Sequence, residues 1–509
     1  MPKENYLSRI SYTVIGNLFR AIMSFVTSMF IARELAPENY GRYIFLIGTF
    51  IALKQLLDFS SSSAFFTFIS QKKRSLKFIK IYWVYVALQL LLPLFMIALV
   101  IPSDLIKTIW QDESKTLIIL ALFAVFFQST VWPVTVQMAE SIRKTYYVQI
   151  INVSLVFLHL LTVIFLWNFD SLALSFLFIV IIIEWIIGVL FLLNIYKKNY
   201  NEPSIEDSKN ESLKSIFNEF WIYCSPFIPY MILGFINEFG EKWMLQEWAG
   251  PEQQAYFGIA NQFASIALIV TVSIIKVFWK EIAEAHKNKN SKLVKKLYLN
   301  STRMLFFIGL MISIPLLPWA NDILLIILGD SYSKGSMVFL IMLLYPIHQT
   351  VGQINATMFY ATENTRPYVI GNIIFLILSI IFTIIFLAPK DFLIPGLAMG
   401  SVGLAIKLVL LQFFQVNAFS WFLAKKYNWN FDGFNQIFLI SLSLFFIYLS
   451  NLIIKQLSIN NIYIDFSLTT LLFLVLMIGI ILFKPGKVGL SSDFINNKFI
   501  FIKNLIKKK

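Results

Sequence analysis

The 509-residue sequence has few charged residues and almost no cysteine. Asp, Glu, Lys and Arg make up 14% of the chain, against about 25% in an average soluble domain. A soluble chain of this length needs more charge to cover its core, so a soluble enzyme is excluded, and the apolar surplus excludes a disordered scaffold. The single cysteine, Cys224, excludes an intramolecular disulfide and a cysteine-based metal site.

Motifs for cofactors and catalysis are also missing. The sequence has no GxxxxGK[ST] loop, so the chain itself does not hydrolyse ATP. It has no His/Cys/Asp/Glu cluster with metal-ligand spacing. The connections between apolar segments are short, and the longest, near 195–218, is a polar linker too small for a catalytic domain. These absences predict a protein without a metal or an organic cofactor.

Apolar residues dominate what is present. They make up 58% of the chain, and the mean hydropathy is +0.73. The apolar residues fall in fourteen stretches of about twenty, the length that crosses ~30 Å of hydrocarbon as a helix. Arg20 interrupts the first stretch, which is also too long for a signal peptide, so it is predicted to be an uncleaved helix. The sequence predicts an all-α polytopic membrane protein with about fourteen transmembrane helices.

The charge balance predicts the orientation. The net charge is +14, which in a soluble protein suggests a nucleic-acid partner. With the N-terminus inside, 30 of the 42 basic residues fall in cytoplasmic loops and tails, eight in outside loops and four inside helices. This asymmetry indicates that both termini are cytoplasmic. Most of the positive charge is then an orientation signal, and no nucleic-acid partner is expected.

An internal repeat divides the chain into two halves. RELAPENYGRY follows the first stretch, and EWAGPEQQAYFG follows the seventh. Each is a short outside turn after the first helix of a half, which indicates a parallel repeat with the substrate site between the halves. The predicted parts are an N-terminal lobe (1–195), a cytoplasmic linker (196–218), a C-terminal lobe (219–424), an extra helix pair (425–483) and a basic cytoplasmic tail (484–509).

Four basic residues lie inside predicted helices: Arg20, Lys54, Lys276 and Lys407. Each costs about 2.5–3.5 kcal/mol at a helix centre, so such residues usually face a cavity. One interpretation is a cationic cavity that binds a phosphate or pyrophosphate, since arginine offers a bidentate fork and lysine a point charge. The alternative is internal pairing, of Lys54 with Asp58 or of Lys407 with Glu184, while Lys276 lies near a helix end and can reach the interface.

The intramembrane acids Asp58, Glu184 and Glu238 are candidates for binding a coupling proton or sodium ion, with pairing to nearby bases as the alternative. His159 and His348 lie in apolar helices and are interpreted as hydrogen-bonded packing residues.

Polar residues and prolines mark two further helices. Gln349, Gln353 and Asn355 fall partly on one face of a helix, where they either contact a hydroxyl-rich substrate or hydrogen-bond within the protein. Pro226 and Pro229 remove two backbone donors and predict a kink in the seventh helix.

The first repeat resembles the oligosaccharide flippases of bacterial surface-polysaccharide synthesis (Wzx-type), in the multidrug/oligosaccharidyl-lipid/polysaccharide exporter (MOP) superfamily. The resemblance rests on Asn17 and Arg20 in the first helix and on the run from Ile31 to Gly41, which is similar to the family's A-R-x-L-x-P-x-x-Y-G. Leu57-Asp58-Phe59 is similar to the family's D-x-G stretch, with Ser60 where glycine is usual. In the second half, Glu241-Lys242 occupies the place of an Asp-Arg pair.

The resemblance implies a MATE-like V-shaped bundle of two six-helix lobes that opens alternately to each side. Its expected function is to move an undecaprenyl-pyrophosphate-linked oligosaccharide across the bacterial inner membrane. Asn17, Arg20, Lys54, Lys276, Lys407, Gln349 and Gln353 would contact the substrate, and Na+ or H+ would drive the cycle. Expected partners are membrane lipids and the pathway's polymerase and glycosyltransferases, around a monomer. The alternatives are a cation-coupled multidrug exporter and a membrane-embedded polymerase or glycosyltransferase.

Overall fold

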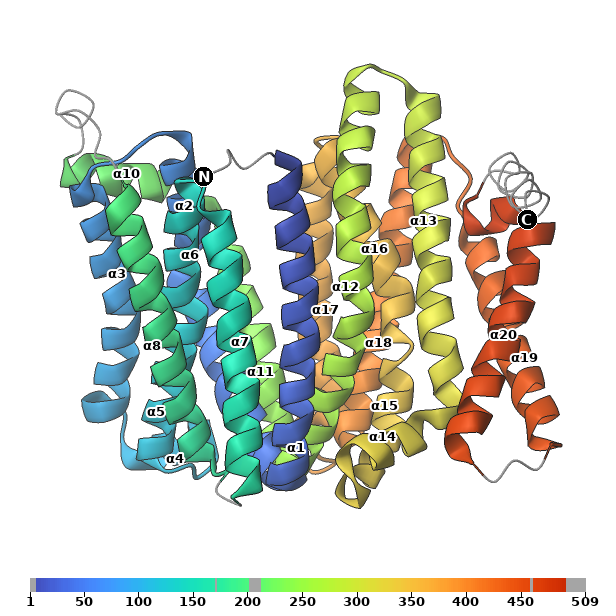
Figure 1. The fold of residues 1–509 in the computed structure, drawn as a ribbon, viewed down its shortest axis with the longest axis horizontal. Helices are drawn as coiled ribbons and strands as arrows, with labels where there is room; N and C mark the ends of the chain where they lie inside the picture. The colour runs from blue at the N-terminus through green and yellow to red at the C-terminus, as the bar shows by residue number, and fades with distance from the viewer. Residues whose placement is uncertain (1–5, 170–171, 201–211, 458–460, 491–509) are drawn as a thin grey trace, which may run out of the picture. The chain divides into compact units, whose positions relative to one another are not determined.

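The computed structural model describes residues 6–169, 172–200, 212–457 and 461–490, without the side chains of residues 6–14, 267, 269–274, 276 and 277. Within these ranges the chain is helical and contains no strand (Figure 1). Each of the predicted apolar stretches falls mainly on one helix or on a run of consecutive helical segments. The all-α prediction is confirmed.

The number of membrane spans is smaller than predicted. Eleven helices in the described ranges are long and apolar enough to cross a membrane, or twelve if the bent pair Asp330–Met342 and Tyr345–Ala361 counts as one span. The count of fourteen is therefore not confirmed. Part of the difference comes from α1 (Tyr6–Asp58), a 53-residue helix that joins the first two predicted stretches across a kink at Ala36.

Packing divides the chain into two compact units. The first comprises Met1–Ala255 and Ile380–Gly400, and the second comprises Tyr256–Ser379 and Ser401–Lys509. The predicted lobes follow chain order instead and remain a prediction. Residues 201–211 of the predicted linker and 491–509 of the predicted tail lie outside the described residues.

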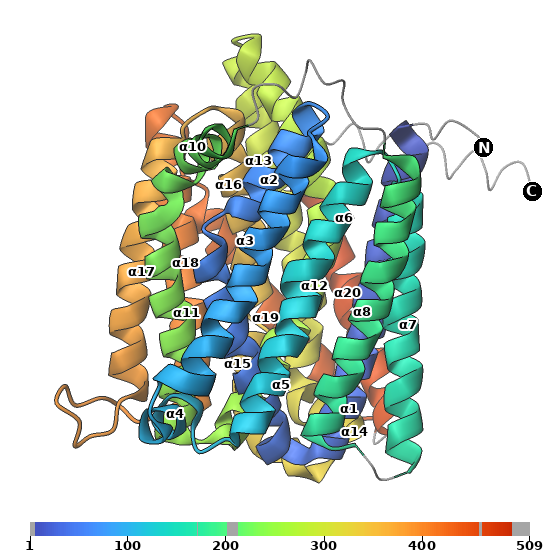
Figure 2. The same cartoon turned by 90° about the vertical axis from the view of Figure 1, so that its left-hand side faces the viewer.

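The first unit is built on α1, which packs against α7 and α11, while α8 packs against α5, α6 and α7 (Figures 1 and 2). Its core is aromatic, with Phe65, Phe78 and Tyr82 stacked between α2 and α3. Its helices after α1 are α2 (Ser61–Gln71), α3 (Leu76–Phe95), α4 (Ser103–Trp110), α5 (Lys115–Phe126), α6 (Trp132–Ser141), α7 (Thr145–Asn168), α8 (Leu174–Asn199), α10 (Leu213–Cys224) and α11 (Ile228–Ala249).

The two turns of the sequence repeat contact each other in the first unit. The second arm of α1 passes so close to the start of α12 (Pro251–Lys287) that a Cβ at Gly41 would overlap the backbone carbonyl of Pro251. Seven residues later, Gly48 lies against the side chain of Lys242 on α11. Both glycines permit the close approach of neighbouring helices.

Three helix breaks shape the first unit. Ala36 has left-handed φ of 56°, and Pro37 follows it. Phe59 and Ser60 have φ of 44° and 62° and separate α1 from α2. The kink predicted from Pro226 and Pro229 is a 3-10 turn, Ser225–Phe227, between α10 and α11.

The second unit includes the C-terminal helix pair in its core. Buried residues of α19 and α20, such as Leu439, Phe473 and Met477, pack with Phe306 of α13 in one cluster. The helices of this unit after α12 are α13 (Ser291–Ser313), α14 (Ala320–Leu328), α15 (Ser336–Met342), α16 (Tyr345–Ala361), α17 (Thr365–Leu387, ending in the first unit), α18 (Gly400–Lys426), α19 (Gly433–Lys455) and α20 (Ile462–Phe483).

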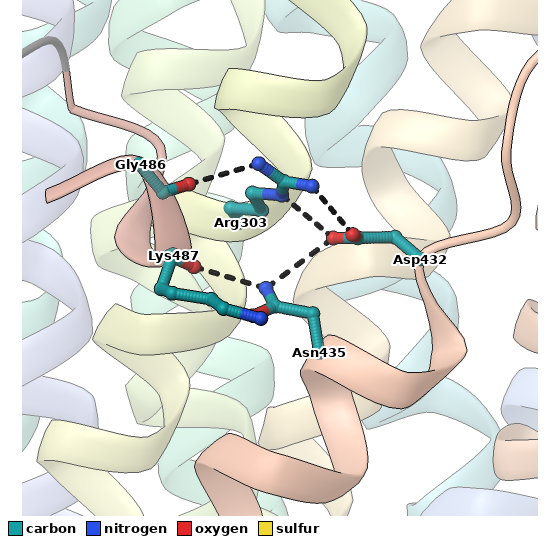
Figure 3. A network of polar contacts seen from close by, with 5 residues as sticks. All are labelled: Arg303, Asp432, Asn435, Gly486 and Lys487. Atoms are coloured by element: carbon teal, nitrogen blue, oxygen red, sulfur yellow. Dashed lines mark hydrogen bonds and ion pairs between the residues drawn. The ribbon is translucent and has the colours of Figure 1, made fainter. Parts of the chain in front are cut away.

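A polar network fastens this pair to α13 (Figure 3). Arg303 donates to both carboxylate oxygens of Asp432, at 2.8 and 2.6 Å, and to the carbonyl of Gly486 at 2.8 Å. Asn435 donates to the carbonyl of Lys487 at 2.9 Å. The network joins α13 to the start of α19 and to the turn after α20.

Candidate functional site

A polar cavity of about 520 Å³ lies within the first unit. Its walls come from both arms of α1, from α7 and α8, and from the start of α6, and Arg20 is one of its lining residues. Gln128 and Ser129 reach it from a π-helical turn, Phe127–Val131, between α5 and α6. Single π-helical turns inside α-helices are frequent at functional sites.

Glu184 and His159 line the same cavity as Arg20. His159 Nδ1 on α7 lies 2.7 Å from Glu184 Oε2 on α8. The Glu184 side chain is only 8% exposed, and its other oxygen, Oε1, is buried and accepts no hydrogen bond from any described residue. The interpretation of His159 as a hydrogen-bonded residue is consistent with this contact, although its partner was not foreseen.

Other cavity residues escaped the sequence reasoning. Gln128 and Ser129 lie in an apolar stretch without charge. Trp132 and Trp185 also line the cavity, with their rings 5.1 Å apart, but tryptophan is common in membrane proteins and gives no signal by itself. The one available signal was the polar interruption Gln128-Ser129-Thr130 within the fourth stretch. Asn17 lies three residues before Arg20 on α1, half-buried, but not on the cavity wall.

Lys54 lies apart from Arg20, although both belong to α1. It lines a small crevice with Gln89 of α3 and Thr130, and it forms no ion pair with any described residue. Asp58 accepts hydrogen bonds from Ser61 Oγ at 3.0 Å and from Ser62 N and Oγ at 3.2 and 2.8 Å. Asp58 therefore caps the start of α2 rather than pairing with Lys54.

The candidates of the second unit contact other helices. Lys407 of α18 is fully buried and donates to Ser379 Oγ of α17 at 3.1 Å. Glu184, the partner suggested for Lys407 from the sequence, pairs with His159. Gln412 of α18 donates to Gln349 Oε1 of α16. Gln353 is half-buried, and Lys276 lies on α12 with its side chain outside the described residues.

Asn355 is also used within the second unit. It accepts from Tyr298 at 2.8 Å and donates to Ser420 at 3.0 Å and to the carbonyl of Val416 at 2.9 Å. For Gln349 and Asn355, the alternative of hydrogen bonding within the protein is the one observed.

The remaining acid, Glu238, pairs with Lys242 one turn later on α11, at 3.3 Å. Among the described residues, no group of three or more His, Cys, Asp or Glu side chains is arranged to hold a metal ion.

Solved structures with the same fold are transporters. The chain superposes on lipid II flippase MurJ in an inward closed conformation with a TM-score of 0.65 and 16% identity, over 92% of this chain and 97% of that one. An inward-facing multidrug resistance MATE transporter of the MOP superfamily gives 0.57 and 13%, over 78% and 93%. A MOP superfamily transporter from Pyrococcus furiosus, with reversed polarity of its binding pocket, gives 0.54 and 13%, over 83% and 96%.

These likenesses define the fold: the chain has the helical fold that MurJ shares with the MATE transporters. The profile of a family described as "Polysaccharide biosynthesis protein" matches residues 7–279, more than half of the sequence. The chain belongs to this family, and the predicted relation to polysaccharide synthesis is confirmed. No curated protein matches the sequence.

Proposed function

We propose that the protein is a flippase that moves an undecaprenyl-pyrophosphate-linked oligosaccharide repeat unit from the inner to the outer leaflet of the bacterial cytoplasmic membrane. The observation that carries the proposal is the family match over residues 7–279, which contains Arg20 and its cavity. The fold shared with a lipid II flippase supports a lipid-linked substrate. Alternating access would move the substrate without a chemical step.

Arg20 is the residue we assign to the pyrophosphate. Its guanidinium belongs to a cavity with the hydroxyl and amide groups of Ser24, Ser129 and Gln128, which suit phosphate and sugar oxygens. We keep Lys54 and Lys276 as proposed substrate contacts at other stages of the cycle. Lys54 lines a separate crevice, and the side chain of Lys276 lies outside the described residues.

Replacement of Arg20 tests the proposal. In a strain that depends on this gene for its surface polysaccharide, Arg20→Ala should lower polymer output about tenfold or more, since charged hydrogen bonds contribute roughly 1.5–3 kcal/mol. Lipid-linked repeat units should accumulate in the inner leaflet, and Arg20→Lys should retain part of the activity. Arg366→Ala, at an exposed position on α17, is the control for loss of a positive charge.

The outcome separates the flippase from its alternatives. Normal polymer from Arg20→Ala, at wild-type protein level in the membrane, contradicts the assignment of Arg20. Unchanged lipid-linked intermediates with altered dye resistance in a deletion strain indicate a multidrug exporter instead. Intermediates that reach the outer leaflet but stay unpolymerised indicate a polymerase.

The proposed cycle also needs an energy source, and we assign coupling to Glu184. Asp58 caps α2 and Glu238 pairs with Lys242, whereas Glu184 has an oxygen without a donor in the cavity of Arg20. A proton or a sodium ion would satisfy that oxygen. The protein would act as a monomer, with both termini in the cytoplasm, beside the pathway's polymerase and glycosyltransferases.

A further inference from the structure

Three segments with basic residues meet at one end of the first unit, and their charges were counted above only as an orientation signal. They are the connection between α2 and α3 with Lys73 and Arg74, the connection between α6 and α7 with Arg143, and the end of α8 with Lys197 and Lys198. These three segments surround a cavity of about 240 Å³, whose wall includes Lys73, Arg74, Arg143, Tyr196 and Tyr200. The cavity is separate from that of Arg20, and none of its lining residues is acidic.

The charges of this cavity are only partly used by the protein. Arg74 is 3% exposed, forms a bidentate ion pair with Glu219 of α10, and lies over the ring of Phe78 at 4.6 Å. In contrast, the side chains of Lys73 and Arg143 form no hydrogen bond or ion pair with any part of the chain that the structure describes. Two positive charges therefore remain available.

Helix capping does not account for these two charges. Basic residues often serve the last carbonyls of helices, and α2, α6 and α8 all end here. Lys73 and Arg143 donate to none of these carbonyls, and other groups reach a carbonyl in the last turns: Arg74 Nε donates to Phe68 O at 3.4 Å, Ser141 to Met138 O at 2.7 Å, and Asn199 to Ile195 O at 2.8 Å.

The backbone conformation at Arg143 also indicates that the arginine side chain has a use other than helix capping. Its φ is 60°, in the left-handed region where a residue that follows a helix is usually glycine or asparagine. Arginine here carries a conformational cost that glycine would avoid.

We propose that this cavity binds the phosphate of an anionic phospholipid headgroup in the inner leaflet. The cavity lies at the ends of membrane-spanning helices, on the side predicted to be cytoplasmic, where anionic lipids attract basic residues. The stacked rings of Tyr196 and Tyr200, with centroids 4.7 Å apart, and the side chains of Ile69 and Ile142 form an apolar wall beside the charges. A headgroup phosphate joined to glycerol fits this combination of cations and apolar surface better than a free anion.

The test is lipid binding by the purified full-length protein in neutral detergent. Phosphatidylglycerol, phosphatidylcholine and inorganic phosphate are titrated separately, with binding measured by native mass spectrometry and by the shift of the unfolding midpoint. The variant is Lys73→Gln with Arg143→Gln. The matched control is Lys292→Gln with Lys296→Gln, which removes two exposed charges from α13.

Saturable binding of phosphatidylglycerol that weakens about tenfold in the variant, but not in the control, supports the site. Equal weakening in the control, equal binding of phosphatidylcholine, or binding of inorganic phosphate as tight as that of phosphatidylglycerol would overturn it. The acidic sequence 201–211, outside the described residues, is a competing occupant. If only a variant with Glu206→Gln and Asp207→Asn binds the lipid, the chain's own linker occupies the cavity, and the proposal fails.

Discussion

Glu184 is the residue whose local environment demands most explanation. One carboxylate oxygen faces His159 at 2.7 Å, and the other is buried without a donor. A charged carboxylate in this position loses its water without full compensation. The cavity's other titratable groups are Arg20 and Tyr43, both on α1. This uncompensated oxygen is the observation behind the proposed assignment of coupling to Glu184.

We expect Glu184→Gln to uncouple transport from a proton gradient, because glutamine keeps the shape of the side chain but binds no proton. In proteoliposomes, a pH gradient should accelerate flipping of a fluorescent lipid-linked substrate by the wild type and leave the variant at its unenergised rate. His348→Gln, on α16 among Phe306 and Phe413, is the control. A variant that still responds fully to the pH gradient, or a wild type that responds only to sodium, contradicts a proton site.

The sequence identifies the charged residues of the cavity but not their contacts. Arg20 and Glu184 stand out because charge inside an apolar helix is costly. Their meeting with His159 depends on how α7 and α8 rotate about their axes, which residue spacing within single helices does not specify. For the same reason the sequence predicts one cavity for Lys54 and Arg20, whereas α1 presents them to different cavities.

At the scale of helices, breaks were predictable where proline or a known motif marks them. Pro226 lies in the 3-10 turn Ser225–Phe227, and Pro229 follows it in the first turn of α11. The turn predicted around Pro37 is the kink in α1. The break after Asp58 was missed because Phe59 and Ser60 are ordinary residues. Ser60 nevertheless adopts φ of 62°, in the left-handed region that glycine enters without strain.

The close approach of the two repeat turns makes Gly41 less tolerant of substitution by alanine than Gly48. We expect Gly41→Ala to destabilise the protein by about 1–3 kcal/mol, because the new Cβ meets the backbone carbonyl of Pro251, which cannot move without the helix. Gly48→Ala meets only the flexible chain of Lys242 and should cost clearly less. Unfolding midpoints in detergent give the comparison, and equal shifts would contradict rigid packing at Gly41.

The polar network between Arg303 and Asp432, which joins α13 to the C-terminal helix pair, should contribute measurably to stability. In Arg303→Gln, Asp432 loses both charge-assisted bonds in a site where the two side chains are 27% and 15% exposed. We expect a loss of about 2 kcal/mol and faster proteolysis between α18 and α19. Lys292→Gln, on the same helix, should change neither property. Unaltered stability of Arg303→Gln would mean that the apolar contacts of Phe473 and Met477 suffice.

For the whole molecule, the sequence predicts the class and family of the protein better than its number of membrane spans. The scarcity of charge identified a membrane protein, and the order of degenerate motifs identified the family. The exact span count depends on where helices break and tilt, as in the bent pair before and after Tyr345. The packing units also differ from the repeat halves, because α10 contacts α2 and α11 contacts α1.

Orientation and span count can be measured together, because the chain has one cysteine and it is buried. After Cys224→Ser, single cysteines replace the exposed residues Lys73, Asp104, Lys390 and Lys455. In intact cells, a membrane-impermeant maleimide should label positions 104, 390 and 455, while position 73 reacts only after lysis. Labelling at 455 follows from α19 and α20 crossing as the thirteenth and fourteenth spans. If 455 is protected while 104 and 390 react, that pair does not span as predicted, and if only 73 reacts, the orientation inferred from the basic residues is inverted.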